Sequence, residues 1–210
     1  MCRLKSCLVL KDRVFCPDYD SHQDMLVALK IKDDEINALK TFVRVELTPP
    51  EGVKSLMTPL DKWTLKVDQD ITPEWWDEKA DRPRVEKAVE AWRRGHVFTE
   101  GEHVVKAVEV YAFGSAIVEA FGSATVIAYG SATVYAYDSA TVKAYGSATV
   151  RTNDSAIVDA FGSATVIAYG NATVKAYESA TVKAYGRSTV VYPRKNKIVY
   201  PAGWTAETHD

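Results

Sequence analysis

The stretch Gly122-Ser-Ala-Thr-Val-Ile-Ala-Tyr129 decides the fold of this chain. It is one copy of an eight-residue unit that recurs eleven times between residues 106 and 193, and we number its positions one to eight from the glycine. The same eight letters return at 162–169, and the five units that contain each copy match in order as a block, which indicates a duplication of coding sequence. The fifth position is valine in every unit: Val110, Val118, Val126, Val134, Val142, Val150, Val158, Val166, Val174, Val182 and Val190.

An even repeat length is typical of β-strands, in which side chains alternate between two faces. If the turns preserve this alternation, each position keeps the same face in every unit. Charged residues occupy position six in Glu119, Lys143, Arg151, Asp159, Lys175 and Lys183. Charges are almost never buried without a partner, so we expect positions four, six and eight to face water. Positions three, five and seven, which read Ala-Val-Ala almost throughout, then face inward.

This thin interior favours a parallel β-solenoid in which each unit supplies one strand and one turn. Glycine, aspartate and asparagine tolerate positive φ better than other residues, so we expect the turn at positions eight, one and two. Two units per coil would give a flat roll of two sheets, and three would give a triangular prism. Two units place Lys143, Asp159 and Lys175 in one column of alternating charge, which favours the flat roll.

The first hundred residues lack the repeat and predict a small α+β domain that caps the solenoid. We divide the chain into this domain (1–102), the all-β solenoid (103–201) and a tail (202–210). Alternating apolar residues between turn residues predict strands at 4–10, 13–16, 41–47 and 63–67. A degenerate last strand is expected at 194–201, where Lys195, Lys197 and Pro201 would protect the edge. Trp204 in the tail could fold back as a lid.

Two helices are predicted in the first domain. Asp20 or Ser21 is a suitable N-cap for a helix that continues to about residue 30. Thr72 followed by Pro73 has the cap-then-proline order that begins a helix, and Gly95 is expected to end it. Apolar residues spaced along one face of this second helix are predicted to join the core, namely Val85, Ala88, Val89 and Trp92.

Cysteine, histidine and aspartate side chains near the N-terminus could bind a metal. Cys2, Cys7, Cys16 and His22 provide four possible zinc ligands, but their spacing differs from paired Cys-x2-Cys knuckles. A second set consists of Asp18, Asp20, His22 and Asp24. We interpret the thiols as ordinary reduced cysteines and the acidic set as a solvated loop and helix cap. Cys2 would become an N-terminal nucleophile if Met1 were removed.

Aromatic and arginine side chains further along the domain also have two interpretations. Trp75 and Trp76 could stack on a base or a sugar, but packing in the core is the simpler explanation. The arginines at 82, 84, 93 and 94 could bind phosphate, but six acidic residues lie among them. We therefore interpret this helix as carrying salt bridges on its surface. We find no catalytic motif and expect no cofactor.

Position eight carries the residues that we consider most informative about function. It reads Phe113, Phe121, Tyr129, Tyr137, Tyr145, Asn153, Phe161, Tyr169, Tyr177 and Tyr185. On the outward face these rings would form ladders along the solenoid, and stacking alone could explain them. Exposed aromatic patches also mark partner sites. We therefore predict an interaction surface formed by Tyr129, Tyr135, Tyr137, Tyr145, Tyr169, Tyr177 and Tyr185.

Charge and hydropathy exclude several classes of protein. The net charge is -2 and the sequence pI is about 6.1, so we expect no attraction to nucleic acid or anionic lipid. No stretch approaches the ~20 apolar residues of a membrane-spanning helix. The apolar run at 7–10 is too short for a secretory signal. These features predict a cytoplasmic protein.

The motif GSATVxAY and its xSATVKAY variants resemble the octapeptide repeats of poorly characterised bacterial and phage proteins. The runs DSHQDML, FVRVELTPP and KWTLKVDQDITPEWW resemble the domain that precedes such repeats. The resemblance implies a phage or bacterial origin and carries no assigned active residues. We expect a non-enzymatic protein that forms homo-oligomers. A host or defence protein is a possible partner of this chain. The alternatives are a small-ligand-binding or N-terminal-cysteine enzyme domain on a solenoid scaffold, and a virion component.

Overall fold

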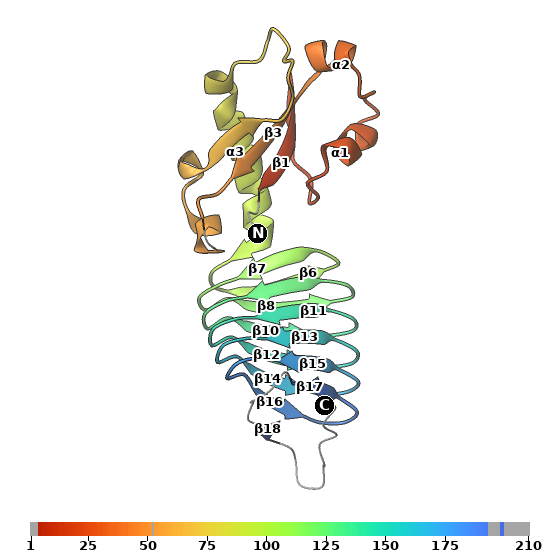
Figure 1. The fold of residues 1–210 in the computed structure, drawn as a ribbon, viewed down its shortest axis with the longest axis vertical. Helices are drawn as coiled ribbons and strands as arrows, with labels where there is room; N and C mark the ends of the chain where they lie inside the picture. Colours follow the sequence, from red (N-terminus) through yellow and green to blue (C-terminus); the bar gives the residue numbers. More distant parts are fainter. Residues whose placement is uncertain (1–3, 52, 193–197, 200–210) are drawn as a thin grey trace. The chain divides into compact units, whose positions relative to one another are not determined.

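The computed structural model describes residues 4–51, 53–192 and 198–199, and its chain divides into two units, residues 1–95 and 96–210. Each unit is described by itself (Figure 1). The first is an α+β unit and the second is a parallel β-solenoid, as the sequence predicts.

The sheet of the first unit has four antiparallel strands in the order β2-β1-β3-β4. The strands are β1 (Lys5–Leu10), β2 (Val14–Phe15), β3 (Phe42–Thr48) and β4 (Thr64–Val67). All four predicted strands are confirmed. Every residue of the central strand β1 is buried, and along β3 buried and half-buried residues alternate after Val43, because one face of that strand packs on the core.

Short helices connect these strands. Helix α1 (His22–Ala28) begins after Ser21, whose hydroxyl accepts a hydrogen bond from the Asp24 amide, so of the two predicted caps, Asp20 and Ser21, it is Ser21 that caps the helix. Met25 and Leu26 pack against Leu8 and other buried residues of the sheet. Three further short helices were not predicted, namely α2 (Glu35–Lys40) and the 3-10 helices η1 (Val53–Met57) and η2 (Leu60–Lys62).

Helix α3 (Glu78–His96) corrects the start predicted at Thr72 and Pro73. Pro73 instead forms a turn in which its carbonyl accepts from the Trp76 amide. The helix begins where the Asp77 carboxylate accepts from the Ala80 amide at 3.1 Å. Asp81 accepts from the Asp77 amide at 3.2 Å, so the two carboxylates cap the helix reciprocally. The helix ends at His96, one residue beyond the predicted Gly95.

Two parallel seven-stranded sheets form the second unit, and each coil contributes one strand to each sheet (Figure 1). Thr141 of β11 aligns with Thr125 of β9, so the coil contains sixteen residues and the two-unit prediction is confirmed. One sheet contains β5 (Val97–Phe98), β7 (Glu109–Ala112), β9 (Thr125–Ala128), β11 (Thr141–Ala144), β13 (Ile157–Ala160), β15 (Thr173–Ala176) and β17 (Thr189–Val191). The other contains β6 (Glu102–Lys106), β8 (Ile117–Phe121), β10 (Thr133–Ala136), β12 (Thr149–Thr152), β14 (Thr165–Ala168), β16 (Thr181–Ala184) and β18 (Ile198–Val199).

The interior between the sheets consists of the alanine and valine side chains of positions three, five and seven, as predicted. These side chains are small, so the two sheets lie close together. Thr152 occupies position seven of β12, where the neighbouring coils have alanine. Position six is outward in most coils, but Tyr111 and Ile127 are only 5% and 2% exposed, which corrects the expectation that this position always faces water.

The turns follow the predicted pattern, with position one in the left-handed region. Glycine occupies most of these places, but Asp138, Asp154 and Glu178 also adopt φ between 54° and 57°. An acidic residue there forms a hydrogen bond with the preceding coil. For example, the Asp138 carboxylate accepts from the Gly122 amide at 2.9 Å. Backbone hydrogen bonds join the same turns from coil to coil, for example from the Ser147 amide to the Gly130 carbonyl.

The predicted last strand is confirmed in part, because β18 pairs with β16 and aligns Ile198 with Val182. Lys195, Lys197, Pro201 and Trp204 lie outside the described residues, and so does Cys2.

Candidate functional site: two rows of stacked aromatic rings

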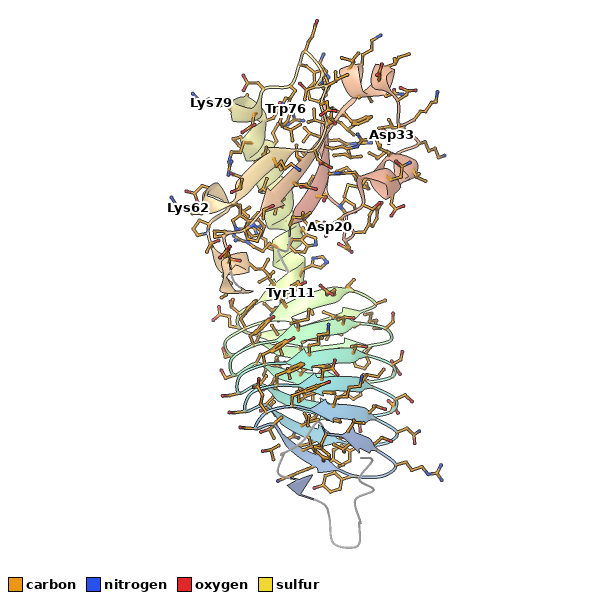
Figure 2. All side chains as sticks on the ribbon, viewed as in Figure 1. Asp20, Asp33, Lys62, Trp76, Lys79 and Tyr111 are labelled. Atoms are coloured by element: carbon orange, nitrogen blue, oxygen red, sulfur yellow. The ribbon has the colours of Figure 1, made fainter. Side chains whose placement is uncertain are left out.

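Position eight places aromatic rings in two rows, one along each edge of the solenoid. We call them the first and the second row. The first row consists of Phe113, Tyr129, Tyr145, Phe161 and Tyr177. The second row consists of the stacked pairs Phe121–Tyr137 and Tyr169–Tyr185, with Asn153 between them. Side chains repeat from coil to coil throughout this unit (Figure 2).

Strand spacing explains the stacking geometry. Centroids of neighbouring rings lie 4.6–5.2 Å apart with interplanar angles of 6–12°. Neighbouring strands of a sheet lie about 4.8 Å apart, so one ring per coil falls at stacking distance. The backbone fixes each ring at its base, because the Tyr145 amide donates to the Ala128 carbonyl at 2.8 Å.

Six of the seven residues predicted to form an interaction surface lie in these rows. Tyr129, Tyr145 and Tyr177 belong to the first row, and Tyr137, Tyr169 and Tyr185 belong to the second. Tyr135 instead lies on a sheet face, in register with Glu119 and Arg151. Most rings in the rows are half-buried, whereas Tyr169 is 43% exposed. Their use as an interaction surface remains a prediction.

The second row is interrupted at one coil. Tyr137 stacks on Phe121, and Tyr169 stacks on Tyr185. Asn153 lies between these pairs, and its side-chain amide forms no hydrogen bond with any residue that the structure describes. The sequence shows the break in the pattern, but only the two-strand coil reveals that Tyr137 and Tyr169 are the rings on either side of it.

The predicted charge column is present on one sheet, where Lys143, Asp159 and Lys175 align in register. Across these three described residues, no lysine nitrogen lies within 4.0 Å of the carboxylate, so the charges form a column without direct ion pairs. The two lysines are exposed and Asp159 is half-buried, and we expect the column to contribute at most a few tenths of a kcal/mol.

A buried lysine explains part of the acidic set in the first unit. Lys5 lies in the central strand, and its ammonium group is 2.7 Å from the Asp20 carboxylate and 5.1 Å from the centre of the Trp92 ring. Asp20 also accepts from the Ser6 amide at 3.0 Å. These contacts pair the buried charge of Lys5, so Asp20 has a structural role. Figure 2 labels Asp20 beside the sheet.

The two described cysteines lie close to each other, and neither forms a disulfide. Cys7 is buried, and hydrogen bonding with Cys16 together with burial raises the pKa of the Cys7 thiol well above its usual value. The Cys16 sulfur lies 3.8 Å from the Ser6 carbonyl oxygen. A neutral, buried thiol is a poor nucleophile and a poor metal ligand, which agrees with the interpretation of ordinary reduced cysteines.

The structure groups His22 with different acidic residues from those suggested by the sequence. Potential ligand atoms of His22, Glu46 and Asp68 lie within 4.8 Å of one another, and within the described ranges Asp18, Asp20 and Asp24 do not join them. The His22 Nδ1 atom is 3.4 Å from Asp68. Lys66 lies 3.5 Å from Asp68 and 4.0 Å from Glu46, so one lysine offsets part of the negative charge of the two carboxylates. These residues come from separate elements, which explains why sequence spacing did not reveal them.

An acidic groove of about 610 Å³ lies near this cluster, in the same unit. Its carboxylates belong to Asp33, Asp34, Glu35, Asp68 and Asp70, and its cations to Arg44 and Lys66. Arg44 forms an ion pair with Asp33. A hydrogen bond from the Asn37 amide lowers the pKa of Asp34, because it stabilises the carboxylate that caps α2.

The aromatic and arginine clusters of this unit make structural contacts. Trp75 donates its indole hydrogen to the Lys40 carbonyl at 2.9 Å. Arg82 pairs with Glu86 at 2.7 Å and also donates to the Trp63 carbonyl at 2.6 Å. The interpretation of α3 as a helix with salt bridges on its surface is confirmed by this pair and by Arg93–Glu90 and Arg94–Glu90, whereas the Arg84–Asp81 pair involves a buried carboxylate.

Comparisons with known proteins give no match: no family model, no curated protein and no solved structure resembles this chain significantly. Among the described helices, none is long and apolar enough to cross a membrane.

Proposed function

We propose that this chain is a non-enzymatic protein of phage or bacterial origin whose rigid solenoid serves for interaction and self-assembly. The observation that carries the proposal is the pair of stacked aromatic rows, which place mostly half-buried rings along two edges, without interruption in the first row and with a single interruption at Asn153 in the second. The origin rests on the resemblance to octapeptide-repeat proteins alone.

Rigid aromatic rows suit a contact surface for an energetic reason. Tyrosine and phenylalanine provide large contact areas and are enriched at protein interfaces. Rings that are already stacked lose little side-chain freedom when a partner binds, so less of the binding energy is spent on ordering them. The coil backbone is hydrogen-bonded to its neighbours, for example from the Tyr177 amide to the Ala160 carbonyl, so side chains rather than backbone groups meet a partner.

The first row is the better candidate for self-association, because its five rings continue without interruption. Two copies of the chain carry rings at the same spacing, so two first rows can pack along their length. In a phage setting, a host or defence protein is a second partner class for the same surface.

The experiment places charge beside the first row and leaves its rings in place. Ser147 and Ser163 are exposed and lie two residues after Tyr145 and Phe161. We expect Ser147→Glu with Ser163→Glu to reduce the mass measured by light scattering to that of a monomer, because the like charges of two copies repel each other. The matched control is Ser147→Ala with Ser163→Ala, which should keep the wild-type mass.

Circular dichroism would verify that both variants keep the fold. A wild-type chain that stays monomeric over a hundredfold range of concentration contradicts self-assembly, as does a charged variant with unchanged mass.

A further inference from the structure

The interruption of the second row has defined dimensions. Tyr137 and Tyr169 lie two coils apart, with Asn153 on the coil between them. Strands in a sheet are about 4.8 Å apart, so the two rings face each other across about 10 Å. A planar group placed midway would stand at the distance that separates stacked rings elsewhere in the rows, 4.6–5.2 Å.

The backbone remains regular through the interruption. The Asn153 amide donates to the Ala136 carbonyl at 2.9 Å, and the Tyr169 amide donates to the Thr152 carbonyl at 3.0 Å. The ring pairs on either side keep interplanar angles of 9° and 12°. The asparagine therefore shortens one side chain of the row without displacing its neighbours. Tyr169 is 43% exposed, whereas its stacking partner Tyr185 is half-buried.

Two carboxylates lie beside the interruption. Asp138 and Asp154 follow Tyr137 and Asn153 directly, and both are exposed. One oxygen of each is used in the turns, since Asp138 accepts from the Gly122 amide at 2.9 Å and Asp154 accepts from the Asp138 amide at 3.3 Å. In the first row, the residue that follows Tyr129 and the residue that follows Tyr145 are both glycine. Glu178 follows Tyr177 of the first row, so the interruption is distinguished by having carboxylates on two adjacent coils, Asp138 and Asp154.

The nearby positively charged residues, Arg151 and Arg187, occupy other positions of the repeat. Arg151 is exposed at position six of β12, on the sheet face rather than at the turn. Arg187 is exposed in a turn further along the same edge. The two carboxylates are therefore the charges adjacent in sequence to the rings and the asparagine.

We infer that the interruption at Asn153 binds the guanidinium group of an arginine side chain from a partner protein. A guanidinium is planar and stacks on aromatic faces, and its cation is attracted by the ring faces and by carboxylates. The ammonium group of lysine carries the same positive charge but is not planar. A nucleotide has a plane, but its phosphate would be repelled by Asp138 and Asp154. The inference rests on the proposed use of the rows as a contact surface, and it names the partner chemistry at one place.

The test is a titration followed by NMR spectra of the tyrosine rings in the full chain. The probe is N-acetyl-arginine methylamide, and the lysine analogue is its control. We expect saturable shifts of the Tyr137 and Tyr169 ring signals with the arginine compound, and much smaller shifts at equal lysine concentration. Asp154→Asn should weaken binding by about two- to fivefold, as expected for an exposed ion pair.

The variant Asn153→Tyr provides the decisive comparison, because it continues the row with the residue that neighbouring coils carry. It should remain folded and should abolish the shifts by filling the space between the rings. Equal shifts with the lysine compound, unchanged binding in Asn153→Tyr, or tighter binding of adenosine monophosphate would each overturn the inference. Self-association is measured separately by light scattering, so a failure of the proposed assembly and a failure of this site give different results.

Discussion

Position seven of the repeat shows how one residue can depart from an otherwise uniform interior. Thr152 is fully buried between Ala136 and Ala168 of the adjoining coils. Its hydroxyl oxygen has no hydrogen-bond partner among the described residues. A buried hydroxyl without a partner costs about 1–3 kcal/mol of stability. Thr152 therefore weakens the coil that also carries Asn153.

We predict that Thr152→Val raises the free energy of unfolding by about 1 kcal/mol, because it keeps the shape of the side chain and removes the hydroxyl. Urea unfolding of the solenoid, followed by far-ultraviolet circular dichroism, measures the change. The control Thr152→Ser keeps the hydroxyl and loses a buried methyl group, so it should lower stability by about 1 kcal/mol. A valine variant that is less stable than the wild type would show that the hydroxyl is satisfied.

Single residues were the level at which the sequence was least informative. A repeat predicts the average environment of each position, and it did so correctly for the buried valines. It could not predict that Ile127 is buried on an outward position, because that depends on what packs around one coil. The helix start predicted at Thr72 and Pro73 was wrong for a related reason, since Asp77 and Asp81 offer a competing cap a few residues later.

At the scale of elements, the turns differ from one another more than their sequences suggest. Gly122 and Gly170 both have positive φ, of 62° and 70°. A β-carbon on Gly122 would find no atom within 4 Å, whereas one on Gly170 would lie 2.8 Å from the Asp154 backbone nitrogen. The same substitution therefore adds only backbone strain in the first turn and a steric clash in the second.

We predict that Gly122→Ala lowers the free energy of unfolding by about 1–2 kcal/mol, the cost of a left-handed conformation. Gly170→Ala should cost more, because the turn must also move away from the preceding coil. Thermal unfolding of the two variants side by side measures the difference. Equal melting temperatures would mean that the coils adjust to the extra atom without cost.

The sequence predicted the elements well where local signals agree with the fold. The strands of the repeat follow from alternation, and the number of strands per coil follows from the column of Lys143, Asp159 and Lys175. The site was only partly predictable. Membership in the aromatic rows was visible in position eight, but the pairing across Asn153 depends on which coils are neighbours. The cluster of His22, Glu46 and Asp68 was missed because three separate elements bring it together.

At the scale of the whole solenoid, stability is a sum of contacts between adjacent coils. Strand β11 has a neighbour on both sides within its sheet, whereas β17 ends its sheet. We predict that hydrogen exchange of backbone amides is at least about tenfold slower in β11 than in β17, because terminal coils open more easily. Exchange measured by mass spectrometry on peptic peptides tests this. Uniform exchange would instead show that the solenoid opens as one cooperative unit.

The duplicated block has a consequence for the arrangement of the faces. Five units at two units per coil amount to two and a half coils, so the identical octapeptides at 122–129 and 162–169 contribute β9 and β14 to opposite sheets. Ile127 is buried, whereas Ile167 is half-buried. Whether the number of added octapeptides is odd or even therefore decides how a change in length affects the faces of the solenoid. Adding an odd number of octapeptides transfers every downstream residue to the opposite face, and adding an even number leaves each on its own.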